Sequence, residues 1–422
     1  MNRRRWWWPL CAAWGLAGGL GPAPAMAAAD AGCTPAATRR ADAFIVGADV
    51  STLEAVERGG GRFSGADGRP ADALALLHEA GFGWGRLRLW HTPVNAEDVV
   101  DGGRVVSRRG EPVGGGSNDL DVTVRLARRL QAQGMKWLLD IHYSDFWADP
   151  GTQRKPQAWR DLQGEALAAA VQAYTEDVLV RLHAAGVAPD MVQLGNEING
   201  GLLWPDGKTW RQQPDERIGG DAGFVALMLA AQRGLQAAQA RTGRQWPLMV
   251  HLAHQGDGHS LDTFVHQFDL LRDAGLRFDV IGLSWYPYYH DGLPALKANL
   301  AALSARYGKP IVVAETAYGH RLDNPGGGGA VFNAEGARKA GVPASPAGQR
   351  ELLMAVARAV AGAPEGLGVF YWEPAWLAVP GAGWRTNEGN AWANQTLFDG
   401  NGRALPGLRA FDDARRAWEA CR

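Results

Sequence analysis

Two glutamates follow short apolar runs in a way that limits the chemistry open to this chain. Glu197 comes after the run 191–194 and is preceded by Asn196, while Glu315 ends the run 311–314. A carboxylate at the end of a buried strand is costly unless a partner or a reaction justifies it. One such residue is as readily a structural glutamate bonded to neighbouring backbone. Two carboxylates facing each other across a cleft can hydrolyse a glycosidic bond, one as acid and the other as nucleophile or base.

The elements that must bring these glutamates together are apolar strands alternating with amphipathic helices. We expect the strands at 44–49, 84–90, 136–142, 191–197, 247–254, 280–287, 310–316 and 368–374. One helix places five residues on one face at helical spacing: Leu167, Val171, Tyr174, Val178 and Leu182. The other helices are expected at 71–80, 119–133, 222–240, 262–274, 294–307 and 406–420. One more is expected after the glycine-rich loop and should end at residue 361. Eight such units in a row predict an α/β fold, a single (β/α)8 TIM barrel with extended βα loops. An open doubly wound sheet is the alternative, although it would not normally need eight such regular units.

Polar and aromatic side chains gather at the expected carboxyl ends of these strands, where such barrels keep their sites. They are Asp49, Arg86, Arg88, Trp90, Asp140, His142, Asp145, Asn196, Glu197, Trp285, Tyr286, Glu315, Trp372 and Glu373. Glutamates that end strands four and seven, the first preceded by asparagine, are the specific part of this pattern. The loop 319–346 beside them carries the glycine run 326–329. We expect it to be a mobile wall of the cleft rather than a packed element.

Several of these residues belong to short motifs that run through the chain after the first 27 residues. The motifs are Gly47-Ala-Asp-Val-Ser51, Arg86-Leu-Arg-Leu-Trp90, Asp140-Ile-His-Tyr-Ser-Asp145, Trp147-Ala-Asp-Pro-Gly151, Leu194-Gly-Asn-Glu-Ile198, Ser284-Trp-Tyr-Pro287, Ala314-Glu-Thr316, Phe370-Tyr-Trp-Glu-Pro-Ala375 and Trp392-Ala-Asn-Gln-Thr-Leu-Phe-Asp399. In them the chain resembles the glycoside hydrolase family 53 endo-β-1,4-galactanases, within a clan of retaining (β/α)8 glycosidases. The resemblance implies endo-cleavage of β-1,4-galactan, the side chain of pectin's rhamnogalacturonan I. It also implies that Glu197 is the acid/base and Glu315 the nucleophile.

The polysaccharide is expected to contact eight further residues: Asp49, Arg88, Trp90, His142, Asn196, Trp285, Tyr286 and Trp372. Arg88 is expected to be the fixed cation that keeps Glu315 ionised, the alternative being an ion pair with Asp49. Asn196 is expected to donate to a substrate 2-hydroxyl, and Tyr286 to orient the nucleophile. A retaining mechanism needs the two carboxyls about 5 to 5.5 Å apart, with the pKa of the acid/base above that of the nucleophile.

No metal or other cofactor is expected from the ligand types. Three histidines lack the spacing of a metal-binding helix, and hydrogen bonding at the rim is expected for His142, His251 and His254. Several bacterial relatives hold calcium between the loops after strands seven and eight. Here that region offers three candidate ligands before a bare glycine run: His320, Asp323 and Asn324. Because no calcium-loop spacing is evident, bound calcium is left open beside simple turn chemistry.

Composition agrees with a globular sugar-binding protein. The 422 residues are 46% hydrophobic and 21% charged, with a formal net charge of −1, so neither nucleic acid nor an anionic membrane is an expected partner. The 18 tryptophans suit a polysaccharide, whose pyranose faces pack on flat rings. Trp372 is expected to floor the −1 subsite unless it only packs in the core. We expect a monomer.

The first residues have the pattern of a secretory signal peptide. A basic start, Arg3-Arg4-Arg5, precedes the apolar stretch 6–20 and the cleavage pattern Ala25-Met26-Ala27. We therefore expect a signal peptide at 1–27 and one catalytic domain at 28–422, secreted or periplasmic.

Cleavage would leave two cysteines, Cys33 and Cys421, one near each end of the mature chain. In an oxidising compartment they are expected to form a disulfide, the alternative being two unrelated thiols. A lipoprotein role for Cys33 is disfavoured by Asp30, which occupies a position that such signals prefer apolar.

Two other functions compete with the first. One is a retaining β-glycanase of the same clan that acts on mannan or cellulose, sharing both glutamates but not the sugar. The other is a non-catalytic glycan-binding protein on the same scaffold. That alternative predicts the loss of one acid, whereas Glu197 and Glu315 are both present.

Overall fold

A computed structural model describes residues 43–419 of the chain. The expected signal peptide at 1–27 and both Cys33 and Cys421 lie outside these residues. Within residues 43–419, no helix combines the length and the apolar composition that crossing a bilayer requires.

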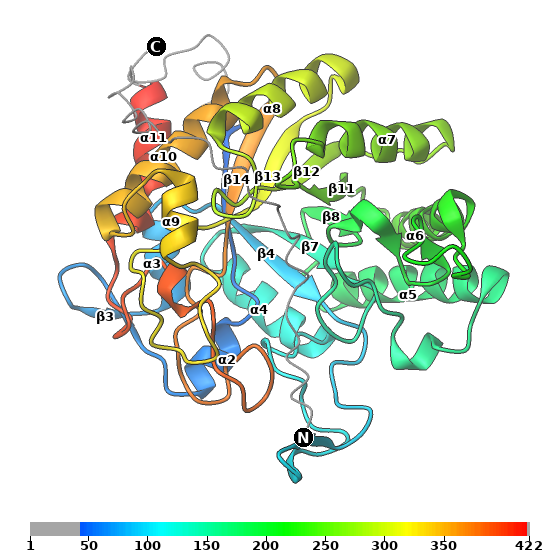
Figure 1. Ribbon diagram of the computed structural model, residues 1–422, viewed down its shortest axis with the longest axis horizontal. Helices are drawn as coiled ribbons and strands as arrows, with labels where there is room; N and C mark the ends of the chain where they lie inside the picture. The colour runs from blue at the N-terminus through cyan, green and yellow to red at the C-terminus, as the bar shows by residue number, and fades with distance from the viewer. Residues whose placement is uncertain (1–42, 420–422) are drawn as a thin grey trace.

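Eight parallel strands form a closed barrel at the centre of the protein (Figure 1). Around the barrel they are β1 (Ile45–Asp49), β4 (Trp84–Leu89), β7 (Lys136–Ile141), β8 (Met191–Leu194), β11 (Leu248–Ala253), β12 (Val280–Ser284), β13 (Ile311–Thr316) and β14 (Gly366–Trp372). The first strand pairs with both β4 and β14, and this closes the sheet on itself. The predicted (β/α)8 barrel is confirmed, because each strand overlaps the segment expected for it.

Helices surround the strands (Figure 1). They are α2 (Leu53–Arg58), α3 (Ala73–Glu79), α4 (Leu120–Ala132), α5 (Gly164–Ala184), α6 (Gly220–Thr242), α7 (Ser260–Asp273), α8 (Leu293–Tyr307), α9 (Ala334–Ala340), α10 (Pro346–Gly362) and α11 (Ala410–Glu419). Local sequence explains several starts. The side chain of Asp119 accepts a hydrogen bond from the backbone N–H of Val122 and caps α4, and Ser345 caps α10 directly before Pro346.

The loops carry short strands and single helical turns. Three antiparallel pairs join β2 (Phe63–Ser64) to β3 (Pro70–Ala71), β5 (Val99–Asp101) to β6 (Arg104–Ser107), and β9 (Gly201–Leu202) to β10 (Gly207–Lys208). The helical turns are η2 (Gln157–Trp159), η3 (Ile198–Gly200), η4 (Ala393–Gln395) and η5 (Pro406–Arg409).

The interior of the barrel is layered along the strands. Its apolar layer is a buried cluster of Ile45, Leu138, Met191, Met249, Val280, Val312, Ala314 and Phe370. Side chains alternate across a strand, so the residue two positions later faces the same way. On three strands that residue is polar and buried: Asp140, Gln193 and His251. The chain therefore places a polar layer directly above the apolar one, toward the carboxyl ends of the strands.

The loop after β13 is more ordered in its packing than the sequence suggested. The expectation that 319–346 holds no packed element is wrong, because this loop contains α9 and a fully buried aromatic residue, Phe332. Its ring lies 4.7 Å from that of Tyr318 and 5.4 Å from that of Tyr288, measured between centroids. The glycine-rich stretch before Phe332 and much of the surface of α9 remain exposed. An apolar anchor thus fixes part of this wall.

Candidate active site

Glu197 sits on a turn that breaks the regular strand geometry. It follows β8 and has a left-handed backbone, with φ 48° and ψ 51°. Gly195 is also left-handed, with φ 80°, and a Cβ there would lie 2.6 Å from the Cγ2 of Ile198. Left-handed non-glycine residues are uncommon and cluster at functional sites. Tyr143 and Glu373, just beyond β7 and β14, share this conformation.

Glu315 reaches the barrel interior through a bulge. Along β13, the register against β12 passes from Val313 opposite Leu283 to Glu315 opposite Ser284, so one residue is extra. Simple alternation from Val312 would place Ala314 inside and Glu315 outside. A β-bulge re-aims the side chains that follow it. The extra residue explains how Glu315 joins the polar layer.

The two glutamates face one another in a narrow space. One oxygen of each carboxylate and one ring nitrogen of His251 all lie within 4.8 Å of one another. Glu197 and Glu315 are 9% and 6% exposed, so both are largely buried but still open to a ligand over a small area. This spacing fits the roughly 5–5.5 Å that retaining glycosidases use and is shorter than the roughly 6.5–9.5 Å of inverting enzymes.

The same three side chains are a possible donor set for a metal ion, but His251 is already engaged on both ring nitrogens. Its Nδ1 lies 2.9 Å from the Oδ1 of Asn196, and its Nε2 lies 2.9 Å from the Oγ of Ser284. An ion would have to displace one of these contacts. The arrangement therefore favours hydrogen bonding, as expected for this histidine, over metal binding.

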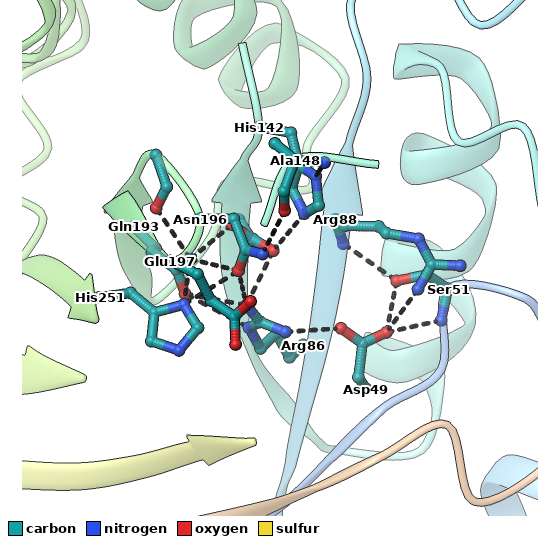
Figure 2. A network of polar contacts seen from close by, with 12 residues as sticks. Asp49, Ser51, Arg86, Arg88, His142, Ala148, Gln193, Asn196, Glu197 and His251 are labelled. Carbon is teal, nitrogen blue, oxygen red and sulfur yellow. Dashed lines mark hydrogen bonds and ion pairs between the residues drawn. The ribbon is translucent and has the colours of Figure 1, made fainter. Parts of the chain in front are cut away.

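Arg86 is the central cation of the polar layer. Figure 2 shows its guanidinium between Asp49 on one side and the group of Gln193, Asn196 and His251 on the other. Its Nη1 lies 2.7 Å from Glu315 Oε1 and 3.0 Å from Asp49 Oδ2. Its Nη2 lies 2.8 Å from Asp140 Oδ2 and 2.8 Å from Asn196 Oδ1.

These contacts correct the role expected for Arg88. The cation beside Glu315 is Arg86, whereas Arg88 donates to Glu373 and lies 3.5 Å from Asp49 Oδ1. The alternative, an ion pair between Arg88 and Asp49, is therefore present. It is longer than the contact between Arg88 and Glu373. Sequence reasoning placed Arg86 at the rim but did not count it among the site residues.

Four residues expected to touch substrate are enclosed by protein instead. Asp49, Arg88, Trp90 and Trp285 are each at most 1% exposed. The indole N–H of Trp285 donates to the carbonyl of Asp291 at 2.9 Å, and that of Trp90 donates to His142 Nδ1 at 3.2 Å. They support the site from behind, and the expectation of direct sugar contact is corrected for all four.

The remaining expected residues lie around the two glutamates. The hydroxyl of Tyr286 donates to Glu315 Oε2 at 2.8 Å, which fits an orienting role. His142 contacts Asp140 through Nε2 at 3.0 Å. Asn196 donates through Nδ2 to the carbonyl of Ala148 at 2.8 Å, which leaves its second N–H for a ligand.

The surroundings separate the two carboxyls in their affinity for a proton. Burial and the nearby charge of Glu315 raise the pKa of Glu197 well above its usual range. Burial raises the pKa of Glu315 too, but Arg86 and the Tyr286 hydroxyl oppose that rise. Two close carboxylates do not both ionise readily. These surroundings favour a proton on Glu197 over one on Glu315.

Tryptophans form a wall beside the pair. The ring centroid of Trp372 lies 4.5 Å from that of Trp392 and 5.8 Å from that of Trp147. Trp147 also stacks on Trp384, at 4.6 Å and 22°. Trp372 is 7% exposed, so packing accounts for most of its surface. Trp384 comes from the long loop after β14, and sequence reasoning did not identify it.

Two of the candidate calcium ligands, Asp323 and Asn324, engage a neighbouring arginine and the backbone. Arg321 pairs with Asp323, and the amide of Asn324 donates to the carbonyls of Gly329 and Asn390. Burial lowers the pKa of His320 to about 4. These contacts fit turn chemistry at Asp323 and Asn324.

The chain is similar to known galactanases over most of its length. The profile of glycosyl hydrolase family 53 matches residues 45–411. The endo-β-1,4-galactanase of Bacillus subtilis (strain 168) is 32% identical over 401 residues, covering 88% of this chain and 86% of that protein. The arabinogalactan endo-β-1,4-galactanase of Humicola insolens is 32% identical over 374 residues, covering 86% and 98%.

Solved structures show the same relation. The family 53 catalytic domain of Ignisphaera aggregans is 38% identical, with a TM-score of 0.77, and the match covers 87% of this chain and 95% of that one. A fungal β-1,4-galactanase structure is 29% identical, with a TM-score of 0.69 and coverage of 87% and 98%. With the family profile spanning nearly all the described residues, this chain belongs to glycosyl hydrolase family 53.

Proposed function

We propose that this protein is an endo-acting β-1,4-galactanase that cleaves the galactan side chains of pectin with retention of configuration. The observation that carries the proposal is the close approach of Glu197 and Glu315, with carboxylate oxygens within 4.8 Å. The spacing belongs to double displacement. The choice of galactan rests on the relatives, two of which carry galactanase in their names.

In the first step, Glu315 attacks the anomeric carbon of the sugar to be cleaved. Glu197 gives its proton to the glycosidic oxygen as the carbon–oxygen bond breaks, and the departing chain leaves with a new hydroxyl. Arg86 and Tyr286 hold the two oxygens of Glu315 and fix its direction of attack. The product of this step is a glycosyl ester on Glu315.

In the second step, water breaks the ester. Glu197, now ionised, takes a proton from the incoming water, whose oxygen bonds to the anomeric carbon and releases Glu315 as a carboxylate. Two inversions give net retention, and both acids return to their starting protonation.

The test uses purified mature protein and three polysaccharides: potato-type galactan, mannan and cellulose. We expect new reducing ends from galactan alone, and NMR of the first products should show the β-anomer before mutarotation. Equal or greater release from mannan or cellulose would favour the related β-glycanase instead. A first-formed α-anomer would contradict double displacement.

We further propose that the protein is secreted or periplasmic and that Cys33 and Cys421 form a disulfide. The proposal rests on the leader pattern and on the pairing of the first and last barrel strands, β1 and β14. Closing so long a loop is worth up to about 5 kcal/mol in chain-entropy models. Mass spectrometry should find cleavage after Ala27, and thiol titration of the denatured, unreduced protein should find none. Two free thiols would refute the bond.

A further inference from the structure

A groove opens beside the turn that carries Glu197, among the segments that follow β8 and β11. Its volume is about 610 Å³, within the roughly 300–1,000 Å³ of small-ligand sites. It is lined by η3, by the segment after β10, and by the first turns of α7. The η3 turn begins directly after Glu197, so the groove continues the space next to the proposed acid.

One wall of the groove is an aromatic ring that lies outside the buried core. Trp210 is 43% exposed, which is unusual for so large an apolar side chain. The Nζ of Lys208 lies over this ring, 4.0 Å from its centroid. On another side the indole packs against Gly200, where an added Cβ would come within 2.8 Å of the indole nitrogen. The ring is thus held in place while much of its surface stays open.

The opposite wall carries an unused acceptor. Gln267 lines the same groove and is 3% exposed. Its Nε2 donates to the carbonyl of Asn199 at 2.6 Å, while its Oε1 has no hydrogen-bond partner among residues 43–419. A buried acceptor without a partner is costly, and a ligand hydroxyl is the kind of donor that would satisfy it. Thr263 and Gln255 add further polar groups to the groove.

We propose that this groove binds the departing end of the polysaccharide, with Trp210 as the platform for a pyranose ring. The inference rests on the proposed function. Glu197 protonates the oxygen that leaves with the departing chain, and the groove starts two residues after it. Trp372 ends β14, which lies across the barrel from β8, and we assign the tryptophan wall around it to the glycosyl part. An open indole and a buried hydroxyl acceptor match the two faces of a galactosyl unit.

The experiment compares two substrates whose leaving groups differ. Galactan oligosaccharides leave as a sugar chain that fills the groove, whereas β-galactobiosyl fluoride loses only fluoride. Trp210→Ala should lower kcat/KM for the oligosaccharides about tenfold to a hundredfold and change that for the fluoride less than about twofold. Trp210→Phe, which keeps a flat ring, should recover part of the loss. Val100→Ala shortens an exposed apolar side chain of β5, outside the groove, and should change neither value.

Each outcome decides the proposal. Selective loss with the oligosaccharides supports it. Equal loss with both substrates would show that Trp210 acts only by supporting the Glu197 turn, and no loss with either would show that the groove binds no sugar. If the wild type fails on galactan, the proposed function falls and this inference with it. If the wild type cleaves galactan but Trp210→Ala is unchanged, only the groove is refuted.

Discussion

The two layers of the barrel interior are built from the same strands and have opposite chemistry. In the lower layer, Leu138 and Met249 pack among apolar side chains. Two residues further along the same strands, Asp140 and His251 belong to a buried polar network. The lower layer stabilises by removing apolar surface from water. The upper layer places charge where water is excluded, so we expect the lower layer to govern stability and the contacts of the upper layer with Glu315 to govern the reaction.

The upper layer holds more negative than positive groups. Two buried arginines, Arg86 and Arg88, face four carboxylates: Asp49, Asp140, Glu315 and Glu373. Burial is the main reason why the pKa of Glu373 rises to about 7, with Arg88 opposing it. Burying an ion pair costs free energy of desolvation. Removing one partner costs more, because the other charge is left buried and unpaired. Within this layer, the contacts of Arg86 with Glu315 are the ones that we expect to serve the reaction.

The largest expected effect is a difference in kcat between variants of two buried glutamates, Glu315 and Glu373, which lie at the ends of neighbouring strands. Glu315→Gln should lower kcat on galactan by roughly ten-thousandfold or more, because no other group is expected to attack the anomeric carbon. Glu373 is fully buried against Thr52 and Arg88, so Glu373→Gln should mainly lower the melting temperature. A comparable loss of kcat in both variants would contradict the assignment.

The two arginines give the next contrast. Arg86→Met removes the cation that touches Glu315, so kcat should fall about a hundredfold or more, and the free energy of unfolding by about 3–5 kcal/mol. Arg88→Met removes a buried cation that does not touch Glu315 and should cost similar stability, with a loss of kcat below about tenfold. Steady-state kinetics and urea unfolding measure both. If the two variants lost kcat equally, Arg86 would have no special role.

The apolar layer should show the reverse behaviour. Leu138→Ala leaves a cavity under Asp140 and should lower the free energy of unfolding by about 2–5 kcal/mol. The kcat of the folded fraction at low temperature should stay within a few-fold of the wild type. A large fall in kcat without a change in stability would mean that the layers are not separate in function.

The smallest effect is a shift in the pH profile. The Tyr286 hydroxyl lowers the pKa of Glu315, so Tyr286→Phe should raise it. Because the reaction needs Glu315 ionised, the acidic limb of kcat/KM should move to higher pH. The alkaline limb reports the loss of the proton from Glu197 and should move less. An acidic limb that stays in place or moves to lower pH would contradict this role of Tyr286.

Much of this architecture follows from the sequence, because eight apolar runs at regular spacing leave few other folds. The alternation of side chains along a strand also indicates the orientation of Trp285. Ser284 bonds His251 inside the barrel, and its neighbour Trp285 therefore points to the outer core. With Ser284 taken as an inward-facing residue, this alternation predicts that Trp285 faces away from the cleft.

Other parts could not be foreseen from the sequence. Arg86 and Arg88 lie on one face of β4, and which of them meets Glu315 depends on the stagger between strands that are not neighbours in the sequence. The bulge in β13 that turns Glu315 inward also has no recognisable pattern in the sequence. Trp384 joins the wall from a distant loop, and only the fold brings it against Trp147.

The division of labour between the two acids is tested most directly by azide rescue of the Glu197→Ala variant. An aryl β-galactoside with a good leaving group needs no protonation, so the glycosyl ester on Glu315 should form and accumulate. Azide should then release it as a β-azide with retained configuration. The Glu315→Ala variant should form no ester, and any rescue should give an α-azide. If the Glu197 variant gave the α-azide and the Glu315 variant the β-azide, the two roles would have to be exchanged.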